Sequence, residues 1–138
     1  MRILDNDLEN PAEVMKALAD VTRLRVLNLL IERECCVCEV VQALGISQTR
    51  ASRNLSQLYQ AGLLEYRRDG PWTIYYLSPE TGAGYRKLVV EAVDLALADS
   101  DLAAADRRRL RQNGRLCPPS STGEPAEPAE ASCPPTVR

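Results

Sequence analysis

Histidine and phenylalanine are both absent from this chain of 138 residues, and tryptophan occurs once. The absence of histidine excludes a histidine general base, Ser-His-Asp and Cys-His nucleophiles, and every metal site that needs an imidazole ligand. Because 45% of the residues are hydrophobic but few are aromatic, a packed core must consist mainly of Leu, Val and Ala. The length suits one domain of ordinary size with a tail, and we expect no enzymatic activity.

Long apolar runs and an excess of positive charge are also missing. The chain has nothing near the roughly 18 consecutive apolar residues of a transmembrane helix, and its first residues lack the apolar run of a signal peptide. We therefore expect a cytoplasmic protein without a membrane partner, whose five cysteines stay reduced. The net charge of −2 means that any DNA binding must depend on a local basic patch.

Start and stop signals predict a mainly helical domain. Asn10 and Pro11 are typical of a helix start, Asp20 and Ser47 of helix caps, and Gly45 of a helix end. Together with the apolar periodicity, these signals predict helices over residues 10–19, from about residue 20, and over residues 36–44, 47–61, 81–99 and 102–112.

Between the fourth and fifth of these helices the pattern changes to that of strands. Residues 64–68 and 72–77 are rich in Tyr, Ile and Thr and flank Asp69-Gly70-Pro71, which predicts a β-hairpin. The order helix, short turn at Gly45-Ile46, helix and hairpin is that of a winged helix-turn-helix. We expect residues 1–113 to form this domain. Residues 114–138 contain six of the nine prolines and are expected to be a disordered tail.

The predicted helix 47–61 offers a surface for reading DNA. Ala51, Leu55 and Leu58 form its expected buried face, while residues 47–63 contain two arginines and no acidic residue. A solvated helix face is the alternative interpretation, and it is our expectation for the arginine-rich residues 107–111. For residues 47–61, the position between a helix-turn and a basic hairpin favours contacts with bases and phosphates. The residues expected to make them are Gln48, Thr49, Arg50, Ser52, Arg53, Asn54, Gln57, Arg67 and Arg68.

Three cysteines, Cys35, Cys36 and Cys38, lie at the start of the predicted helix 36–44. The helix dipole there favours thiolates, and three sulfur ligands without histidine suit As(III) or Sb(III), with Cd(II) or Pb(II) as alternatives. On a regular helix Cys35 and Cys38 share a face, whereas Cys36 and Cys38 lie about 200° apart. Binding one ion through both is therefore expected to unwind the first turn and to lower the affinity for DNA.

Other interpretations of the three cysteines remain open. They could be core residues, or they could form a disulfide that switches DNA binding without a metal. The spacing of Cys35 and Cys38 is also that of a C-x-x-C oxidoreductase. A thioredoxin-like enzyme requires a strand before this motif, and here a helix is predicted instead.

Taken together, these features resemble the ArsR/SmtB family of dimeric winged-helix metal-sensing repressors. The resemblance implies a homodimer that releases a roughly palindromic operator when an ion binds, with residues 81–99 as the dimerisation helix packed against the first helix. It also implies that Cys36 and Cys38 form the sensing pair. The segments that carry it are residues 18–27, 34–40, 47–48, 52–55, Leu58, residues 62–64 and 67–70, Trp72 and Tyr75.

The sequence departs from the family patterns at the third ligand. Arsenic sensors of this type have a third cysteine where this chain has Val41, and the cadmium and lead sensors use N-terminal cysteines, which residues 1–34 do not contain. Cys35 is the expected substitute, and Cys117 is a weaker candidate because closing a flexible tail costs entropy. The family's zinc site on the dimerisation helix needs histidine and is excluded. We favour As(III) or Sb(III), for which three thiolates suffice.

Overall fold

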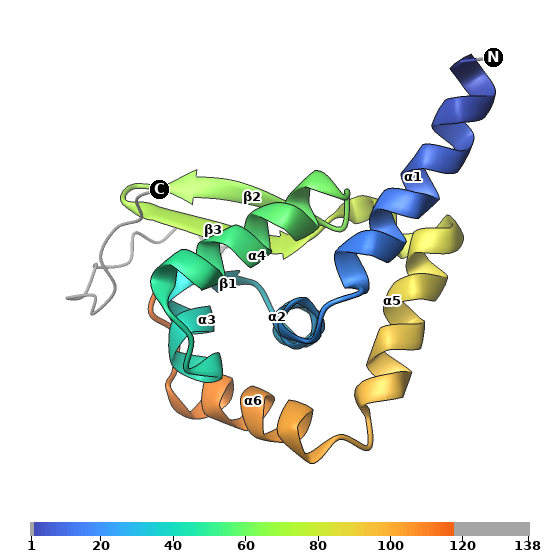
Figure 1. Ribbon diagram of the computed structural model, residues 1–138. Coiled ribbons are helices and arrows are strands. Elements are labelled where there is room, and N and C mark those ends of the chain that lie inside the picture. The colour runs from blue at the N-terminus through green and yellow to red at the C-terminus, as the bar shows by residue number, and fades with distance from the viewer. Residues whose placement is uncertain (1, 118–138) are drawn as a thin grey trace.

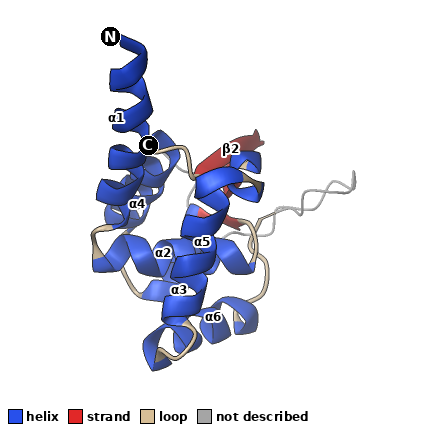
Figure 2. Ribbon diagram, turned by 90° about the vertical axis from the view of Figure 1, so that its right-hand side faces the viewer, coloured by secondary structure: helices blue, strands red, loops and turns tan. Residues whose placement is uncertain are grey.

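The computed structural model describes the backbone of residues 2–117 and the side chains of residues 10–117. Helix α2 lies at the centre, with the other helices and a small antiparallel sheet around it (Figure 1). Figures 1 and 2 both show the N-terminal part of α1 extending beyond the rest of the domain. The elements in chain order are α1 (Arg2–Leu18), α2 (Val21–Glu32), β1 (Cys35–Cys36), α3 (Val37–Leu44), α4 (Gln48–Gln60), β2 (Leu64–Asp69), β3 (Trp72–Leu77), the 3-10 helix η1 (Pro79–Gly82), α5 (Gly84–Leu97) and α6 (Asp101–Gln112).

The helix-turn-helix has the boundaries that its capping residues predict. The Asp20 carboxylate accepts a hydrogen bond of 2.8 Å from the backbone N–H of Thr22 at the start of α2. Gly45 ends α3 with φ 71°, a left-handed conformation that glycine adopts without strain. The Ser47 hydroxyl accepts a hydrogen bond of 3.1 Å from the backbone N–H of Arg50 and caps α4. The short turn between α3 and α4 is thus confirmed.

The main hydrophobic core lies between α2, α3 and α4. Ala51, Leu55 and Leu58 of α4 are fully buried, as the helical spacing predicts, and they pack in one cluster with Leu27 and Leu29 of α2. This packing holds α4 by one face and leaves its polar face outward. The core is made mainly of Leu, Val and Ala, which agrees with the scarcity of aromatic residues.

The predicted hairpin is present, and a third strand that the sequence did not indicate pairs with it. Strands β2 and β3 pair antiparallel, and β1 pairs antiparallel with the other edge of β3. In β1, Cys35 lies opposite Tyr75 and Cys36 lies opposite Ile74. A strand of two residues is too short to show an alternating pattern. Two of the three clustered cysteines are therefore in a sheet rather than in a helix.

Two predicted helix starts are wrong. Helix α1 begins at Arg2 and continues through Pro11, where proline removes only one backbone hydrogen bond. The helix expected over residues 81–99 begins only at Gly84, after η1. Gly82 and Gly84 lower helix propensity at this point, and Gly84 adopts φ 67°. Within residues 2–117, no helix has the length and apolar character needed to cross a bilayer.

The last described residues pack back onto the domain. After α6, residues 115–117 lie against the start of α3, where Cys117 is buried. Residues 118–138, the greater part of the expected tail, lie outside the described residues. The arginines of α6 are only in part the solvated face that we expected: Arg108, Arg109 and Arg111 are exposed, but Arg107 and Arg109 also join helices. Arg107 donates to Asn28 and Asp94, and Arg109 donates to the carbonyl oxygen of Ala43.

Candidate metal centre and nucleic-acid interface

Cys36 and Cys38 lie close together at the junction of β1 and α3. Cys36 is the N-cap of α3 and has an extended backbone, with φ −90° and ψ 171°. Its side chain is therefore not placed by helical geometry, and its Sγ lies 4.0 Å from Sγ of Cys38. The expectation that these two residues point about 200° apart, so that the first turn must unwind to bring them together, is wrong.

Cys35 is directed elsewhere. Successive residues of a strand point to opposite faces, and Cys35 packs in the main core, whereas Cys36 and Cys38 pack in a second cluster with Trp72 and Ile74. The thiol of Cys35 donates to the carbonyl oxygen of Arg33 at 3.4 Å. Cys35 and Cys38 do not share a helix face as expected, because the helix begins after Cys36. The structure thus brings together two of the three cysteines that we expected to bind the ion. Cys38 is disulfide-bonded in it, so the expectation that all five cysteines stay reduced is wrong for this state.

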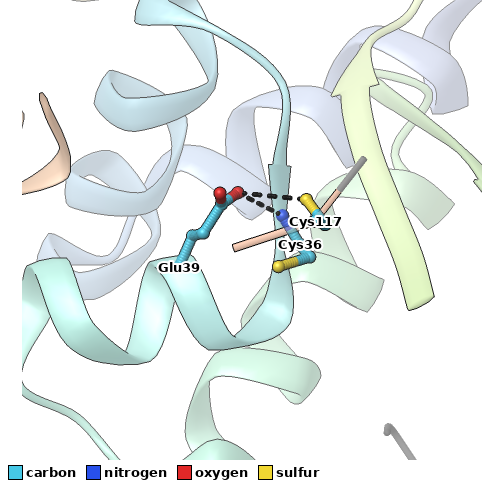
Figure 3. A group of neighbouring side chains, drawn as sticks. All are labelled: Cys36, Glu39 and Cys117. Carbon is cyan, nitrogen blue, oxygen red and sulfur yellow. Dashed lines mark hydrogen bonds between the residues drawn. The ribbon is translucent and has the colours of Figure 1, made fainter. Parts of the chain in front are cut away.

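The sulfur that accompanies Cys36 and Cys38 in the second cluster comes from Cys117 (Figure 3). The Sγ atoms of Cys36 and Cys117 and a carboxylate oxygen of Glu39 lie within 4.8 Å of one another. All three residues are buried, with Cys117 5% exposed. Cys117 follows α6, so residues far apart in the sequence form this group.

Glu39 is a residue of this site that our sequence reasoning missed. Its buried carboxylate accepts hydrogen bonds from the backbone N–H of Cys36 at 2.9 Å and of Leu116 at 2.7 Å. It also accepts from the thiol of Cys117 at 3.4 Å and from the guanidinium of Arg33 at 3.3 Å. Its position three residues after the N-cap is that of the acidic residue in a capping box, which is the signal that could have indicated it.

The cysteines whose titration is resolved hold their protons in this state. The hydrogen bond with Cys117 and burial raise the pKa of the Cys36 thiol, and the nearby Glu39 carboxylate adds to this effect. Burial and the same carboxylate raise the pKa of Cys35. The expected preference for thiolates at the helix start is therefore wrong here, because burial and a negative charge outweigh the helix dipole. An ion that binds these sulfurs must displace protons.

Two connections join the cysteine-bearing segment to the wing. The first is the pairing of β1 with β3. The second is Glu34, which precedes β1 and accepts hydrogen bonds from Arg67 of β2 at 2.8 Å and from Arg115 at 2.9 Å. Burial alone would raise the pKa of Glu34, but the two arginines hold it below its ordinary value. The start of α3 is therefore connected to the wing by strand pairing and by an ion pair.

The expected DNA-contacting residues divide into two groups. Thr49, Arg50, Arg53 and Gln57 of α4 and Arg68 of β2 are exposed, and Gln48 and Ser52 are partly exposed. Asn54 and Arg67 are placed differently. The Asn54 side chain is 8% exposed and donates to the carbonyl oxygen of Arg50 at 2.8 Å, while Arg67 is held by Glu34. The basic and polar surface of α4 is thus present, with these two side chains turned into the structure.

Aromatic residues that our sequence reasoning did not include fix the wing beside α4. The ring of Tyr66 lies 5.1 Å from that of Tyr59 and 5.6 Å from that of Tyr75, centre to centre. Tyr66 and Tyr75 are direct partners in the hairpin register, which the symmetric hairpin pattern could have indicated. A groove of about 260 Å³ lies between α4 and the hairpin, and Ser52 and Arg68 are among its lining residues.

Comparisons with known proteins agree with this architecture. Residues 20–66 match the family described as bacterial regulatory protein, arsR family. The arsenic resistance transcriptional regulator ArsR1 of Pseudomonas putida is 41% identical over 110 residues, which cover 78% of this chain and 83% of that protein. A cadmium resistance regulatory protein, a CadC homolog of Staphylococcus aureus, is 38% identical over 76 residues, which cover 52% of this chain and 63% of that protein.

A solved structure shows the same fold. The homodimeric winged helix-turn-helix DNA-binding domain of Mb0332 from Mycobacterium bovis, a possible ArsR-family regulator, is 32% identical, with a TM-score of 0.59 over 70% of this chain and 86% of that one. The fold expected from the sequence, mainly helical with a β-hairpin wing, is confirmed. The chain belongs to the arsR family of bacterial regulatory proteins, whose members are transcriptional regulators and not enzymes.

Proposed function

We propose that this protein is a cytoplasmic repressor that binds operator DNA as a homodimer and releases it when As(III) or Sb(III) binds the cysteines at the start of α3. The observation that carries the proposal is the 4.0 Å separation of Sγ of Cys36 and Cys38 in a buried cluster. This cluster contains residues of both α3 and the wing strand β3. An ion bound there acts on both DNA-binding parts of the fold.

The residues of this cluster fit a thiophilic ion. The sulfur atoms of the cluster lie among apolar side chains such as Trp72 and Ile74, and soft ions prefer thiolates to oxygen ligands. Cys38 is disulfide-bonded in this structure and must be reduced before it can bind an ion. Arsenite and antimonite suit a site with sulfur ligands and no imidazole. Cd(II) and Pb(II) share this preference, and a carboxylate oxygen of Glu39 nearby could serve them as a further ligand. They are the alternative inducers.

The coupling to DNA follows from the position of the cluster. An ion that draws the two sulfur atoms closer than 4.0 Å shifts Cys36 and the first turn of α3. Cys36 pairs with Ile74 of β3, and α3 packs on α4, so this adjustment changes how the wing and α4 sit relative to each other. An ion that stabilises a conformation of low DNA affinity lowers the affinity of the protein for DNA. By linkage, bound DNA lowers the affinity of the protein for the ion by the same factor.

The exposed polar face of α4 is the proposed reading surface. Thr49, Arg53 and Gln57, with Gln48 and Ser52 beside them, are suited to base edges in the major groove. Arg50 at the start of α4 and Arg68 of the wing are suited to phosphates. For Asn54 and Arg67, which the sequence placed among the DNA contacts, the structure favours roles in holding α4 and the wing in position.

A homodimer formed through α1 and α5 is part of the proposal. Leu88 and Leu95 of α5 are 64% and 77% exposed, and Met15 of α1 is 53% exposed. Leu88 and Leu95 are two turns apart on α5 and so form one apolar stripe. Such a stripe is typical of an interface. The two-fold axis would place two α4 helices on a roughly palindromic operator.

The decisive test is a titration of the reduced protein bound to a DNA fragment from upstream of its own gene, followed by fluorescence anisotropy. We expect arsenite to release the DNA in a stoichiometric reaction with the subunits. Cd(II), Pb(II) and the thiol oxidant diamide are titrated in parallel. Release only by Cd(II) or Pb(II) would replace the proposed inducer. Release only by diamide would support a thiol redox switch instead, and failure to bind the fragment would contradict the repressor assignment.

A further inference from the structure

We infer that Cys117 is the third sulfur ligand of the ion site, together with Cys36 and Cys38. This inference rests on the proposed function and names a residue that the helix-turn-helix itself does not contain. Cys117 is a free cysteine, 5% exposed, and it packs in the same cluster as Cys36 and Cys38. Its Sγ lies within 4.8 Å of Sγ of Cys36 (Figure 3).

The three residues before Cys117 are each held in place by a hydrogen bond. The backbone N–H of Leu116 donates to Glu39 at 2.7 Å, and the guanidinium of Arg115 donates to Glu34 at 2.9 Å. The carbonyl oxygen of Gly114 accepts from Arg33 at 3.3 Å. The entropic cost of bringing a distant cysteine to the site is therefore already met in the folded chain. Chain entropy therefore does not disfavour Cys117 as the third ligand relative to Cys35.

Glu39 acts in this arrangement as a positioning residue. One carboxylate oxygen accepts the backbone N–H of Cys36, and the other accepts the backbone N–H of Leu116. The two segments that supply sulfur are thus held to the same carboxylate. Cys35 lacks this placement because it lies on the opposite face of β1 and packs among the apolar residues of the main core.

Cys38 is disulfide-bonded in this structure, so a thiol reductant must first return its sulfur to the thiol. The binding step that follows needs no oxidant or reductant. Arsenious acid, As(OH)₃, exchanges its three As–O bonds for three As–S bonds, and the three thiol protons leave with the hydroxyl groups as three water molecules. The oxidation state of arsenic does not change. The product links the segment after α6 to β1 and α3. The bound ion thereby joins β1, α3 and the segment after α6 to one another.

The test counts the sulfur atoms bound to As(III) by X-ray absorption spectroscopy on the full-length, reduced protein. We expect three sulfurs in the wild type and in C35A/C133S, a variant that keeps only Cys36, Cys38 and Cys117. We expect two sulfurs and one oxygen in C117S. The C117S change should weaken As(III) binding by more than the roughly 10–100-fold that loss of an outer-shell partner costs. Operator binding and thermal unfolding in the absence of arsenite show whether each variant is folded.

The two experiments are independent, so either variant alone can overturn the inference. Two sulfurs in folded C35A/C133S, or three sulfurs in folded C117S, would show that Cys117 is not the third ligand. In both cases arsenite would still release the wild-type protein from DNA, and the proposed function would stand. If arsenic in the wild type has no sulfur neighbours and DNA is not released, the proposed function itself fails.

Discussion

Arg25 of α2 and Asp106 of α6 form a two-point ion pair, with Nε to Oδ2 at 2.8 Å and Nη2 to Oδ1 at 2.9 Å. Asp106 is fully buried, and Arg109 also donates to it at 2.6 Å. The charge and hydrogen bonds of Asp106 raise the pKa of Arg25. The pair fixes α6 against α2. Because Cys117 lies five residues after the end of α6, the pair also helps to set where Cys117 meets the site.

The first prediction concerns the stability that this pair provides. Asp106→Ala leaves Arg25 partly buried without its partner, and loss of one member of a buried pair costs about 3–5 kcal/mol. We expect this loss in the free energy of unfolding from urea denaturation. Asp94→Ala is the matched control, because Asp94 also pairs with an arginine but is 53% exposed and should cost less than about 1 kcal/mol. Equal losses in the two variants would show that the Arg25–Asp106 pair has no special role.

The second prediction concerns the sensing pair. Cys36→Ser and Cys38→Ser should each leave operator binding within about twofold of wild type but abolish its response to arsenite, because the ion then no longer links Cys36 to Cys38. Anisotropy titrations with and without arsenite measure both effects. Cys133→Ser is the matched control and should respond normally. A normal response in either Cys36→Ser or Cys38→Ser would remove that residue from the site.

Much of the fold was predictable because its signals are local. The caps Asp20 and Ser47, the left-handed Gly45 and the hairpin turn each act within a few residues. The starts of α1 and α5 differ from the predicted ones. Helix α1 continues through Pro11, and α5 begins only at Gly84. Local signals therefore located the elements well and their ends less reliably.

The ion site was harder to predict because its geometry is not local. The identity of Cys36 and Cys38 could be read from the sequence, but their separation depends on β1, a strand that exists only by pairing with β3. The burial of Cys117 depends on where α6 ends and on Glu39. The direction of the Cys36 pKa shift likewise results from a thiol contact across 81 residues of chain. Sequence spacing alone contains none of these distances.

The third prediction concerns pH and Glu34. Its folded pKa lies below the ordinary value of 4.5, so its pairing stabilises the protein above that value, and this contribution is lost as pH falls through the folded pKa. Glu34→Gln should lower the free energy of unfolding by about 1 kcal/mol at neutral pH and by less at about pH 3. Urea denaturation at both values measures this. An unchanged difference between variant and wild type at the two pH values would contradict the pairing.

The fourth prediction concerns the dimer. Leu95→Asp places a charge in the apolar stripe of α5 and should convert the dimer to a monomer without unfolding it, because Leu95 is 77% exposed in the single chain. Sedimentation velocity measures the change. Leu102→Asp is the matched control, since Leu102 is 48% exposed on α6 and lies outside the stripe. A dimer that survives Leu95→Asp would place the interface elsewhere.

The fifth prediction separates the wing from the other basic surfaces. Arg68→Ala should weaken binding to operator and unrelated DNA alike and should lower the slope of log affinity against log salt by roughly 1, because one phosphate contact is lost. Arg53→Ala should weaken operator binding more than binding to unrelated DNA, because we propose that Arg53 contacts bases. Arg108→Ala is the control for net charge, because Arg108 is another exposed arginine and lies on α6. If Arg108→Ala changes the salt slope as much as Arg68→Ala does, the wing has no specific phosphate contact, and the charge of the whole domain accounts for the attraction to DNA.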